Sequence, residues 1–397
     1  MVTERLAVDP EMSFVHALLA SGGRDLEYCY QCATCTVVCP ITPDGTPFPR
    51  KEMIFAQWGV KEKLLRSLDS WLCIHCNDCS SHCPRGAKPG DVMAAIRALS
   101  VQYYSFPAFL ARAAVTPSRI WLLFIIPIVI IGAVILGLHG AAGFAFLGGE
   151  VVFSKMLPVP VIDAIFLPAC AFAGVTALVG LWRFIAAMRR EYPRTENGEP
   201  LAAAVVGAAK DIFSHSKFRD CDENRGRNGA HLLAMYGFIG LFITTTAVAA
   251  LYYFDRFGLE VATTPLDFFH PVKILGNVSG TMLMLACVLI VARRLDSARV
   301  GTNNFFDWTF VWILFLTVIT GFLSQLGRVF APAAAAYLAY YVHLVLVFFL
   351  LAYAPHTKFA HLFFRTASMI YARYAGRNIV LPVTNGGAGG REGGATA

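Results

Sequence analysis

The stretch Cys29-Tyr30-Gln31-Cys32-Ala33-Thr34-Cys35-Thr36-Val37-Val38-Cys39-Pro40 decides how the first hundred residues fold. Its spacing, Cys-x2-Cys-x2-Cys-x3-Cys-Pro, recurs as Cys73-x2-Cys76-x2-Cys79-x3-Cys83-Pro84. Three cysteines two residues apart can bind neighbouring irons of one cubane, and the fourth usually binds the other cluster. The spacing therefore predicts two [4Fe–4S] clusters, the first held by Cys29, Cys32, Cys35 and Cys83 and the second by Cys73, Cys76, Cys79 and Cys39.

The alternatives for these cysteines are weaker. Zinc ribbons use Cys-x2-Cys pairs but lack the third and fourth cysteines of this pattern. Disulfides are disfavoured in the cytoplasm. His75 and His82, inside the second motif, are expected to be solvated. The remaining cysteines, Cys170, Cys221 and Cys287, are isolated, and the first and last lie in apolar segments where packing roles are expected.

The composition of the whole chain excludes a purely soluble protein. Of the 397 residues, 56% are hydrophobic and 15% are charged, whereas soluble proteins carry about 25% charged residues. A spanning helix needs about 20 mostly apolar residues. Six segments meet this requirement: 120–138, 160–182, 232–254, 274–292, 308–327 and 337–357.

The predicted architecture is an N-terminal α-helical ferredoxin-like two-cluster domain followed by an all-α six-helix transmembrane bundle. Its expected parts are the cluster domain over 1–106, the membrane domain over 107–378 with a loop at 183–230, and a flexible glycine-rich tail over 379–397. An apolar stretch at 201–213 predicts a short helix, which could lie along the membrane surface or be an ordinary surface helix.

The basic residues predict the orientation. An even number of spans places both termini on one side, and the loops on that side carry most of the arginines and lysines. By the positive-inside rule that side is the cytoplasm, so a multi-pass protein of the cytoplasmic (inner) membrane with both termini inside is expected. The absence of a signal peptide from the first residues agrees with this orientation.

Four histidines near the ends of the apolar segments are candidate haem ligands. His231 and His361 are expected at the cytoplasmic side, and His270 and His343 at the far side. Two bis-histidine haem b groups, one above the other, fit this arrangement. His343 and His361 are 18 residues apart, so on a continuous helix they share one face and are about 27 Å apart. His356 falls on the opposite face and is a poorer candidate.

These residues resemble a known family. The double cysteine motif resembles the ferredoxin-like subunit of heterodisulfide reductases, and the part from Arg227 to Arg365 resembles their cytochrome b subunit, itself similar to the gamma subunit of respiratory nitrate reductase. His343-Leu344 with Pro355, Lys358 and His361 matches the last helix of the gamma subunit. Asn228-Gly229-Ala230-His231, Gly237 and Gly240-Leu241-Phe242 resemble an earlier ligand helix, but Leu241 stands where that helix has a second histidine.

A fusion of the two modules is similar to the membrane subunits of quinone-interacting membrane-bound oxidoreductase complexes. The resemblance implies electron transfer between menaquinone, two b haems, two clusters and soluble flavin/iron–sulfur partner subunits, in sulfur metabolism with adenylylsulfate reductase. Lys273, one turn from His270, is the candidate quinone-site residue; a lysine that snorkels to the interface is as plausible.

Other classes stay open. The chain could serve another quinone-linked dehydrogenase, or be a cluster-regulated transporter or sensor without haem. No Gly-x-Gly-x-x-Gly loop follows a plausible strand, so flavin chemistry is expected to belong to a partner. We therefore expect a subunit of an oxidoreductase complex with no catalytic residues of its own and no nucleic acid partner.

Overall fold

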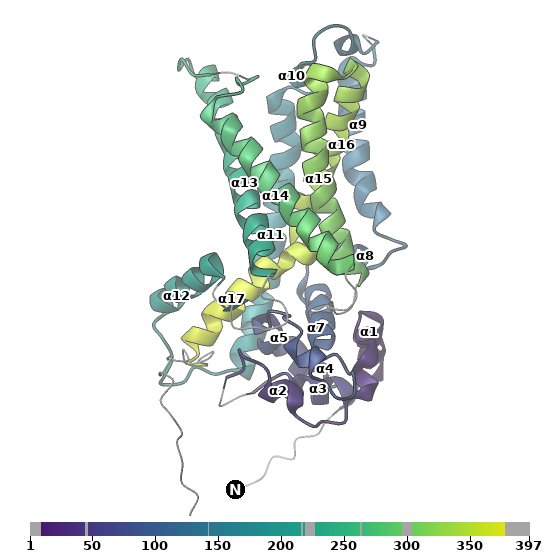
Figure 1. Ribbon diagram of the computed structural model, residues 1–397. Coiled ribbons are helices and arrows are strands. Elements are labelled where there is room, and N and C mark those ends of the chain that lie inside the picture. Colours follow the sequence, from purple (N-terminus) through teal and green to yellow (C-terminus); the bar gives the residue numbers. More distant parts are fainter. Residues whose placement is uncertain are drawn as a thin grey trace, which may run out of the picture.

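Figure 1 shows the computed structural model, which describes residues 9–43, 47–141, 143–215, 217–218, 227–262, 264–295 and 304–377. Within these ranges every regular element is a helix. Short helices at one end form the cysteine-rich domain, and long helices stand above it as a bundle. The predicted tail at 379–397 and Cys221 lie outside the described residues.

The cysteine-rich domain is built around α7 (Pro89–Tyr104), which is buried on most of its surface, including Val92, Met93 and Ile96. Trp71 is also buried and stacks on Phe364 with ring centroids 5.1 Å apart. The other elements of this domain are α1 (Met12–Ala20), η1 (Arg24–Tyr28), α2 (Thr34–Val37), α3 (Arg50–Gln57), α4 (Lys61–Arg66), α5 (Asp69–Leu72) and α6 (Asp78–Ser81).

Six helices in the described residues are long and apolar enough to cross a membrane. They are α9 (Trp121–His139), α11 (Val159–Glu191), α13 (Arg227–Arg256), α14 (Pro271–Leu295), α15 (Phe305–Phe330) and α16 (Ala333–Ala352). At most 44% of the most apolar window of each helix is buried within the chain, as expected for helices whose outer side chains are covered by lipid. Together with the cysteine-rich domain, this arrangement confirms the predicted fold class.

Small residues let α13 approach α14 closely. A Cβ added at Gly237 would lie 2.8 Å from the carbonyl oxygen of Ser279, and one added at Gly240 would collide with the Ser279 side chain. Small residues at helix contacts are how membrane helices pack closely without a hydrophobic driving force. The two glycines that resemble the ligand helix of the gamma subunit therefore pack α13 against α14.

The last spanning helix is shorter than predicted. It ends at Ala352, and the short turns η4 (Ala354–His356) and η5 (Lys358–Ala360) precede α17 (His361–Tyr374). Pro355 explains the break, because a proline disfavours helical backbone at the preceding residue. The expectation of one continuous helix joining His343 to His361 is therefore wrong. His356, in the break, is fully buried with Nε2 3.1 Å from the Phe106 carbonyl.

The remaining helices are α8 (Ala108–Val115), η2 (Ala145–Leu147), α10 (Phe153–Met156) and α12 (Leu201–Ser214). The structure contains the helix expected at 201–213, and Val206 and Phe213 on α12 are exposed. Arg373 of α17 pairs with Glu199 at 3.0 Å and with Asp211 at 2.9 Å, which holds α12 beside α17. Whether α12 lies along the membrane surface or is an ordinary surface helix stays open.

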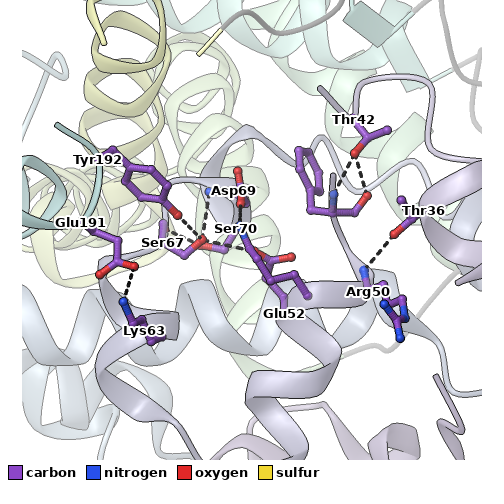
Figure 2. Close-up of polar contacts among 12 residues, drawn as sticks. Thr36, Thr42, Arg50, Glu52, Lys63, Ser67, Asp69, Ser70, Glu191 and Tyr192 are labelled. Atoms are coloured by element: carbon purple, nitrogen blue, oxygen red, sulfur yellow. Dashed lines mark hydrogen bonds and ion pairs between the residues drawn. The ribbon is translucent and has the colours of Figure 1, made fainter. Parts of the chain in front are cut away.

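Polar contacts tie the cysteine-rich domain to the bundle (Figure 2). Lys63 of α4 pairs with Glu191 at the end of α11 at 2.7 Å. The Tyr192 hydroxyl donates to Ser67 Oγ at 3.4 Å, and Ser67 in turn donates to the buried Glu52 at 3.3 Å. Burial raises the pKa of Glu52 to about 8. The domain is thus fixed to α11 through groups that are partly withdrawn from water.

Candidate metal centres

The two cysteine loops have the same backbone conformation. In the first loop Gln31 and Ala33 have positive φ angles of 67° and 69°, and at the equivalent positions of the second loop His75 and Asn77 have 57° and 73°. None of the four is a glycine, so each residue carries a conformational cost of about 1–2 kcal/mol. Such strain persists only where the surroundings fix it, as at ligand-binding loops.

The thiols gather in two groups that exchange their last member. Cys35 lies within electrostatic reach of Cys29, Cys32 and Cys83. Cys39 lies within reach of Cys73 and Cys76, and Cys79 is close to all three. The fourth cysteine of each motif therefore lies near the first three of the other motif, and Cys79 is also within reach of Cys35. The assignment of ligands to the two clusters stays a prediction.

The surroundings of these thiols suit ligands of buried clusters. Burial raises the pKa of Cys35 to about 11 and that of Cys39 to about 12, so without a cation these thiols stay protonated at neutral pH. Backbone N–H groups of His75 and Ala87 donate to Cys73 Sγ and Cys83 Sγ, both at 3.4 Å. In the part of the chain that the structure describes, no three His, Cys, Asp or Glu side chains could hold a single metal ion.

The first loop lies at the surface. Cys32 is exposed, as are Tyr28, Tyr30 and Val37 around it. Val37 is 83% exposed. The guanidinium of Arg85 lies 5.8 Å from the centroid of the Tyr30 ring. This face of the domain is thus open to a partner.

The second loop instead faces the bundle, where three arginines bind its backbone. Arg97 Nη1 donates to the Ser70 carbonyl at 2.8 Å. Arg365 Nη1 donates to the carbonyls of Trp71 at 2.9 Å and Cys73 at 2.8 Å. Arg227 Nη1 donates to the His75 carbonyl at 2.6 Å. Buried positive charge therefore surrounds the second cysteine group.

His231 and His361 lie within electrostatic reach of each other and of Arg227 and Arg365, the arginines that bind this loop. Nδ1 of His361 lies 2.6 Å from the Lys358 carbonyl, and Nδ1 of His231 lies 2.7 Å from Nε2 of His215. A carbonyl only accepts hydrogen bonds, so His361 carries its proton on Nδ1 and Nε2 keeps a lone pair. Haem-ligating and metal-ligating histidines are commonly oriented in this way.

His343 has the same kind of support inside the bundle. Its Nδ1 donates to the Thr317 carbonyl of α15 at 3.0 Å and lies 3.2 Å from Thr320 Oγ1. A Cβ added at Gly321 would lie 3.1 Å from His343 Cε1, so the ring packs closely over this glycine and would have to shift slightly for a larger residue. Leu241, where the related helix has a histidine, packs against the apolar core of the bundle.

No contact among the described residues joins His270 to His343. His270 precedes α14 and its Nδ1 accepts from the Val272 N–H at 3.3 Å. Lys273 lies one turn further along α14, near enough to Arg328 for like-charge repulsion. The far-side ligand pair and the quinone role of Lys273 therefore stay predictions.

Two expectations for individual residues need correction. His75 is not solvated: it is largely buried against Asp91, with Nε2 3.4 Å from Oδ1, and burial lowers its pKa to about 4. Cys170 is exposed on α11 and does not pack within the chain, whereas Cys287 is fully buried as expected. His82 is exposed, also as expected.

Comparisons with known proteins support the cluster domain. A 4Fe-4S dicluster domain model matches residues 28–88. A protein of Archaeoglobus profundus, named as resembling a heterodisulfide reductase subunit, is 32% identical over 105 residues, which are 26% of this chain and 56% of that protein. The iron–sulfur subunit of the CoB–CoM heterodisulfide reductase of Methanopyrus kandleri is 35% identical over 77 residues, 19% of this chain and 40% of that protein.

A relative of another kind is the membrane subunit of the dihydromethanophenazine:CoB–CoM heterodisulfide reductase of Methanosarcina acetivorans. It is 25% identical over 139 residues, which are 33% of this chain and 53% of that protein. The chain spans about half the length of the curated relatives it matches. No solved structure matches the chain.

These relatives and the fold agree that the chain has two parts, a cluster domain and a helical bundle. The cysteine-rich domain matches the dicluster model, and six apolar helices follow it. The relatives include both an iron–sulfur and a membrane subunit of heterodisulfide reductases. The chain thus combines a domain that matches a 4Fe-4S dicluster model with a bundle of helices long and apolar enough to cross a membrane several times.

Proposed function

We propose that the chain is the membrane electron-transfer subunit of a quinone-linked oxidoreductase of the QmoC kind. It would relay electrons between menaquinone and cytoplasmic flavin/iron–sulfur partner subunits, in sulfur metabolism together with adenylylsulfate reductase. One observation carries the proposal: two arginines that hold the second cysteine loop each lie one helical turn from a candidate haem ligand.

Those two turns link the domain and the bundle. Arg227 and His231 are four residues apart at the start of α13, and His361 and Arg365 are four residues apart at the start of α17. Residues four apart share one face of a helix. The arginines point to the second loop, so the two histidines lie beside it. The same helices, α13 and α17, therefore position the candidate haem ligands and the arginines that bind the second cysteine loop.

Within this proposal the cysteine domain covers 1–106 and the membrane domain 107–378. The first cluster would be held by Cys29, Cys32, Cys35 and Cys83, and the second by Cys73, Cys76, Cys79 and Cys39. A haem b would be held by His231 and His361, and a far-side haem b by His343 with His270. When bound, these groups supply one-electron carriers.

The chain's own residues do the positioning. Lys358 and Thr317 accept through their carbonyls from His361 and His343 and fix both rings. Arg97, Arg227 and Arg365 neutralise the thiolates of the second cysteine group. The exposed loop around Cys32 offers the surface at which a soluble subunit would bind. We place this loop and both termini on the cytoplasmic side, as the basic loops indicate.

A second candidate follows from the name of one relative. The Methanosarcina acetivorans relative belongs to a reductase named for dihydromethanophenazine. A membrane-soluble carrier other than menaquinone, with a heterodisulfide-reductase-like partner, would use the same metal groups in this chain. The surfaces described here fit either partner, so the carrier must be identified by direct reduction assays with each one.

The test is a redox-titrated visible spectrum of the purified full chain, with iron and haem counted per polypeptide. We expect two b-type haems and about eight cluster irons. The variant His270→Ala should lose one haem, and Lys273→Gln should keep both haems but slow their reduction by menaquinol. A chain with clusters but no haem would overturn the proposal in favour of a cluster-bearing transporter or sensor.

A further inference from the structure

A cavity of about 240 Å³ opens where α4 and α7 of the cysteine domain meet the end of α11. Its lining includes Arg66, Arg183 and Arg190 together with Glu62, Tyr103 and Trp182. Typical small-molecule sites measure about 300–1,000 Å³. The cavity is therefore suited to a small polar group and too small for a complete cofactor. None of the proposed metal ligands lines it.

The cavity carries an excess of positive charge. Glu62 is its one carboxylate, and it already pairs with Arg66. Arg183 donates to the Tyr104 carbonyl at 3.2 Å, which leaves its charge uncompensated. Arg190 is exposed and makes no ion pair among the described residues. Two guanidinium groups thus face the cavity without a counter-ion, and guanidinium binds phosphate well through paired hydrogen bonds.

An apolar stripe continues from the cavity along the spanning helix. Trp182 at its mouth is 72% exposed. Leu178 and Val175, four and seven residues earlier on α11, are 67% and 60% exposed and fall on the same face. Tryptophan is enriched where the headgroup region of a membrane meets its hydrocarbon core. The cavity therefore lies at headgroup level, with a lipid-facing path leading away from it.

We propose that this cavity binds the phosphate headgroup of an anionic phospholipid, whose acyl chain follows Trp182, Leu178 and Val175. Basic pockets at the membrane surface bind anionic headgroups in this way. Because α4 and α7 form one wall and α11 the other, the lipid bridges the cysteine domain and the bundle. The membrane thereby helps to fix the domain against the spanning helices.

The experiment uses the full chain in neutral detergent, titrated with phosphatidylglycerol or phosphatidylcholine and analysed by native mass spectrometry. We expect preferential binding of phosphatidylglycerol, weakened about tenfold or more in the double variant Arg183→Gln/Arg190→Gln. Arg293→Gln, which removes a single charge at the corresponding end of α14, is the control and should bind normally. Equal binding of both lipids, or an unaffected double variant, would overturn the proposal.

Further measurements distinguish a lipid headgroup from free phosphate, and loss of lipid binding from loss of folding. Inorganic phosphate at millimolar concentration should not displace the lipid, and displacement would assign the cavity to a free anion. Phosphatidylglycerol brominated in its acyl chains should quench tryptophan emission of the unaltered chain more than that of Trp182→Phe. Iron content equal to that of the unaltered chain shows that each variant is folded, and equal quenching in Trp182→Phe would refute the acyl path.

Discussion

Arg365 Nη1 donates a 2.8 Å hydrogen bond to the carbonyl oxygen of Cys73. Through this bond α17, which begins at the candidate haem ligand His361, holds the first ligand of the second cysteine group. Burial lowers the pKa of Arg365 to about 10, and the guanidinium still stays charged at neutral pH. A buried cation here favours the more negative, reduced form of a cluster bound nearby.

Replacing this arginine tests that electrostatic role. We expect Arg365→Gln to lower the midpoint potential of the second cluster, because the reduced form loses a stabilising charge. The first cluster, beside the exposed Cys32, should change little. An EPR-monitored redox titration of the purified chain distinguishes the two signals.

Arg373→Gln is the control for that titration. It removes the same charge from α17, but Arg373 pairs with Glu199 and Asp211, away from the cysteine loops. Both potentials should stay at their original values in this variant. Equal shifts in the two variants would mean that the total charge of α17, and not the bond to Cys73, sets the potential.

The histidine pair beside the second loop yields a second prediction. His231→Ala and His361→Ala should each abolish one b-type haem, because each removes one of two axial nitrogens. His215→Ala should keep that haem but weaken its retention by about 10–100-fold, as for other partners that orient a ligand. Pyridine haemochrome assays on the purified chain measure the count and its loss during dialysis.

His356→Ala provides the matched control for these variants. His356 is buried five residues before His361, but its Nε2 lies 3.1 Å from the Phe106 carbonyl. The variant should lower the melting temperature and retain the full haem content. Loss of haem from His356→Ala would transfer the ligand role to this residue and contradict our assignment.

Local patterns predicted much of this structure. The cysteine spacing alone predicted the two-cluster domain, which the 4Fe-4S dicluster model supports. The exchange of Cys39 and Cys83 between the clusters stays a prediction. Runs of apolar residues predicted all six spanning helices, because each must satisfy its backbone within a hydrocarbon layer. These features depend on residues that are neighbours in the sequence.

What the sequence could not predict depends on tertiary contacts. The predicted segment runs to residue 357, past the observed end at Ala352, because hydropathy does not show that Pro355 breaks the helix. Arg227 and Arg365 bind backbone carbonyls more than 150 residues away, and no local period marks such a bond. His215 stands in a basic loop, and only the fold brings it to His231. His75 was expected in solvent because its burial beside Asp91 also depends on a tertiary contact.

The buried carboxyl of Glu52 predicts a pH dependence of stability. Its pKa is about 8 in the folded chain because burial penalises the charged form, and its ordinary value is 4.5. Between these values the folded state binds a proton that the unfolded state does not, so stability falls as the pH rises. The slope is at most about 1.4 kcal/mol per pH unit.

Thermal unfolding of the full chain in neutral detergent, measured at several pH values from 6 to 9, tests this prediction. The melting temperature of the unaltered chain should decline from pH 6 to about pH 8 and then level off, because above its folded pKa Glu52 is ionised in both states. It should vary less in Glu52→Gln. Glu27→Gln, an exposed carboxyl of the same domain, should reproduce the unaltered curve. An undiminished slope in Glu52→Gln would assign the dependence to other groups.

The crossed cysteine groups give the last prediction. Cys83 belongs to the second motif but lies within electrostatic reach of Cys29 and Cys35 of the first. Cys83→Ser should therefore disturb the first cluster, and Cys39→Ser should disturb the second. Because the second cluster lies beside Arg365, the two variants can be told apart in an Arg365→Gln background.

In that background, the cluster that survives in Cys83→Ser should titrate at the lowered potential, since it is the one beside Arg365. The cluster that survives in Cys39→Ser should titrate as in the chain with Arg365 intact. Iron counts near four per chain in each variant confirm that one cluster remains. The opposite pairing of variant and potential would mean that each motif binds its own cluster, and the close approach of Cys83 to Cys29 would then reflect only the proximity of the two sites.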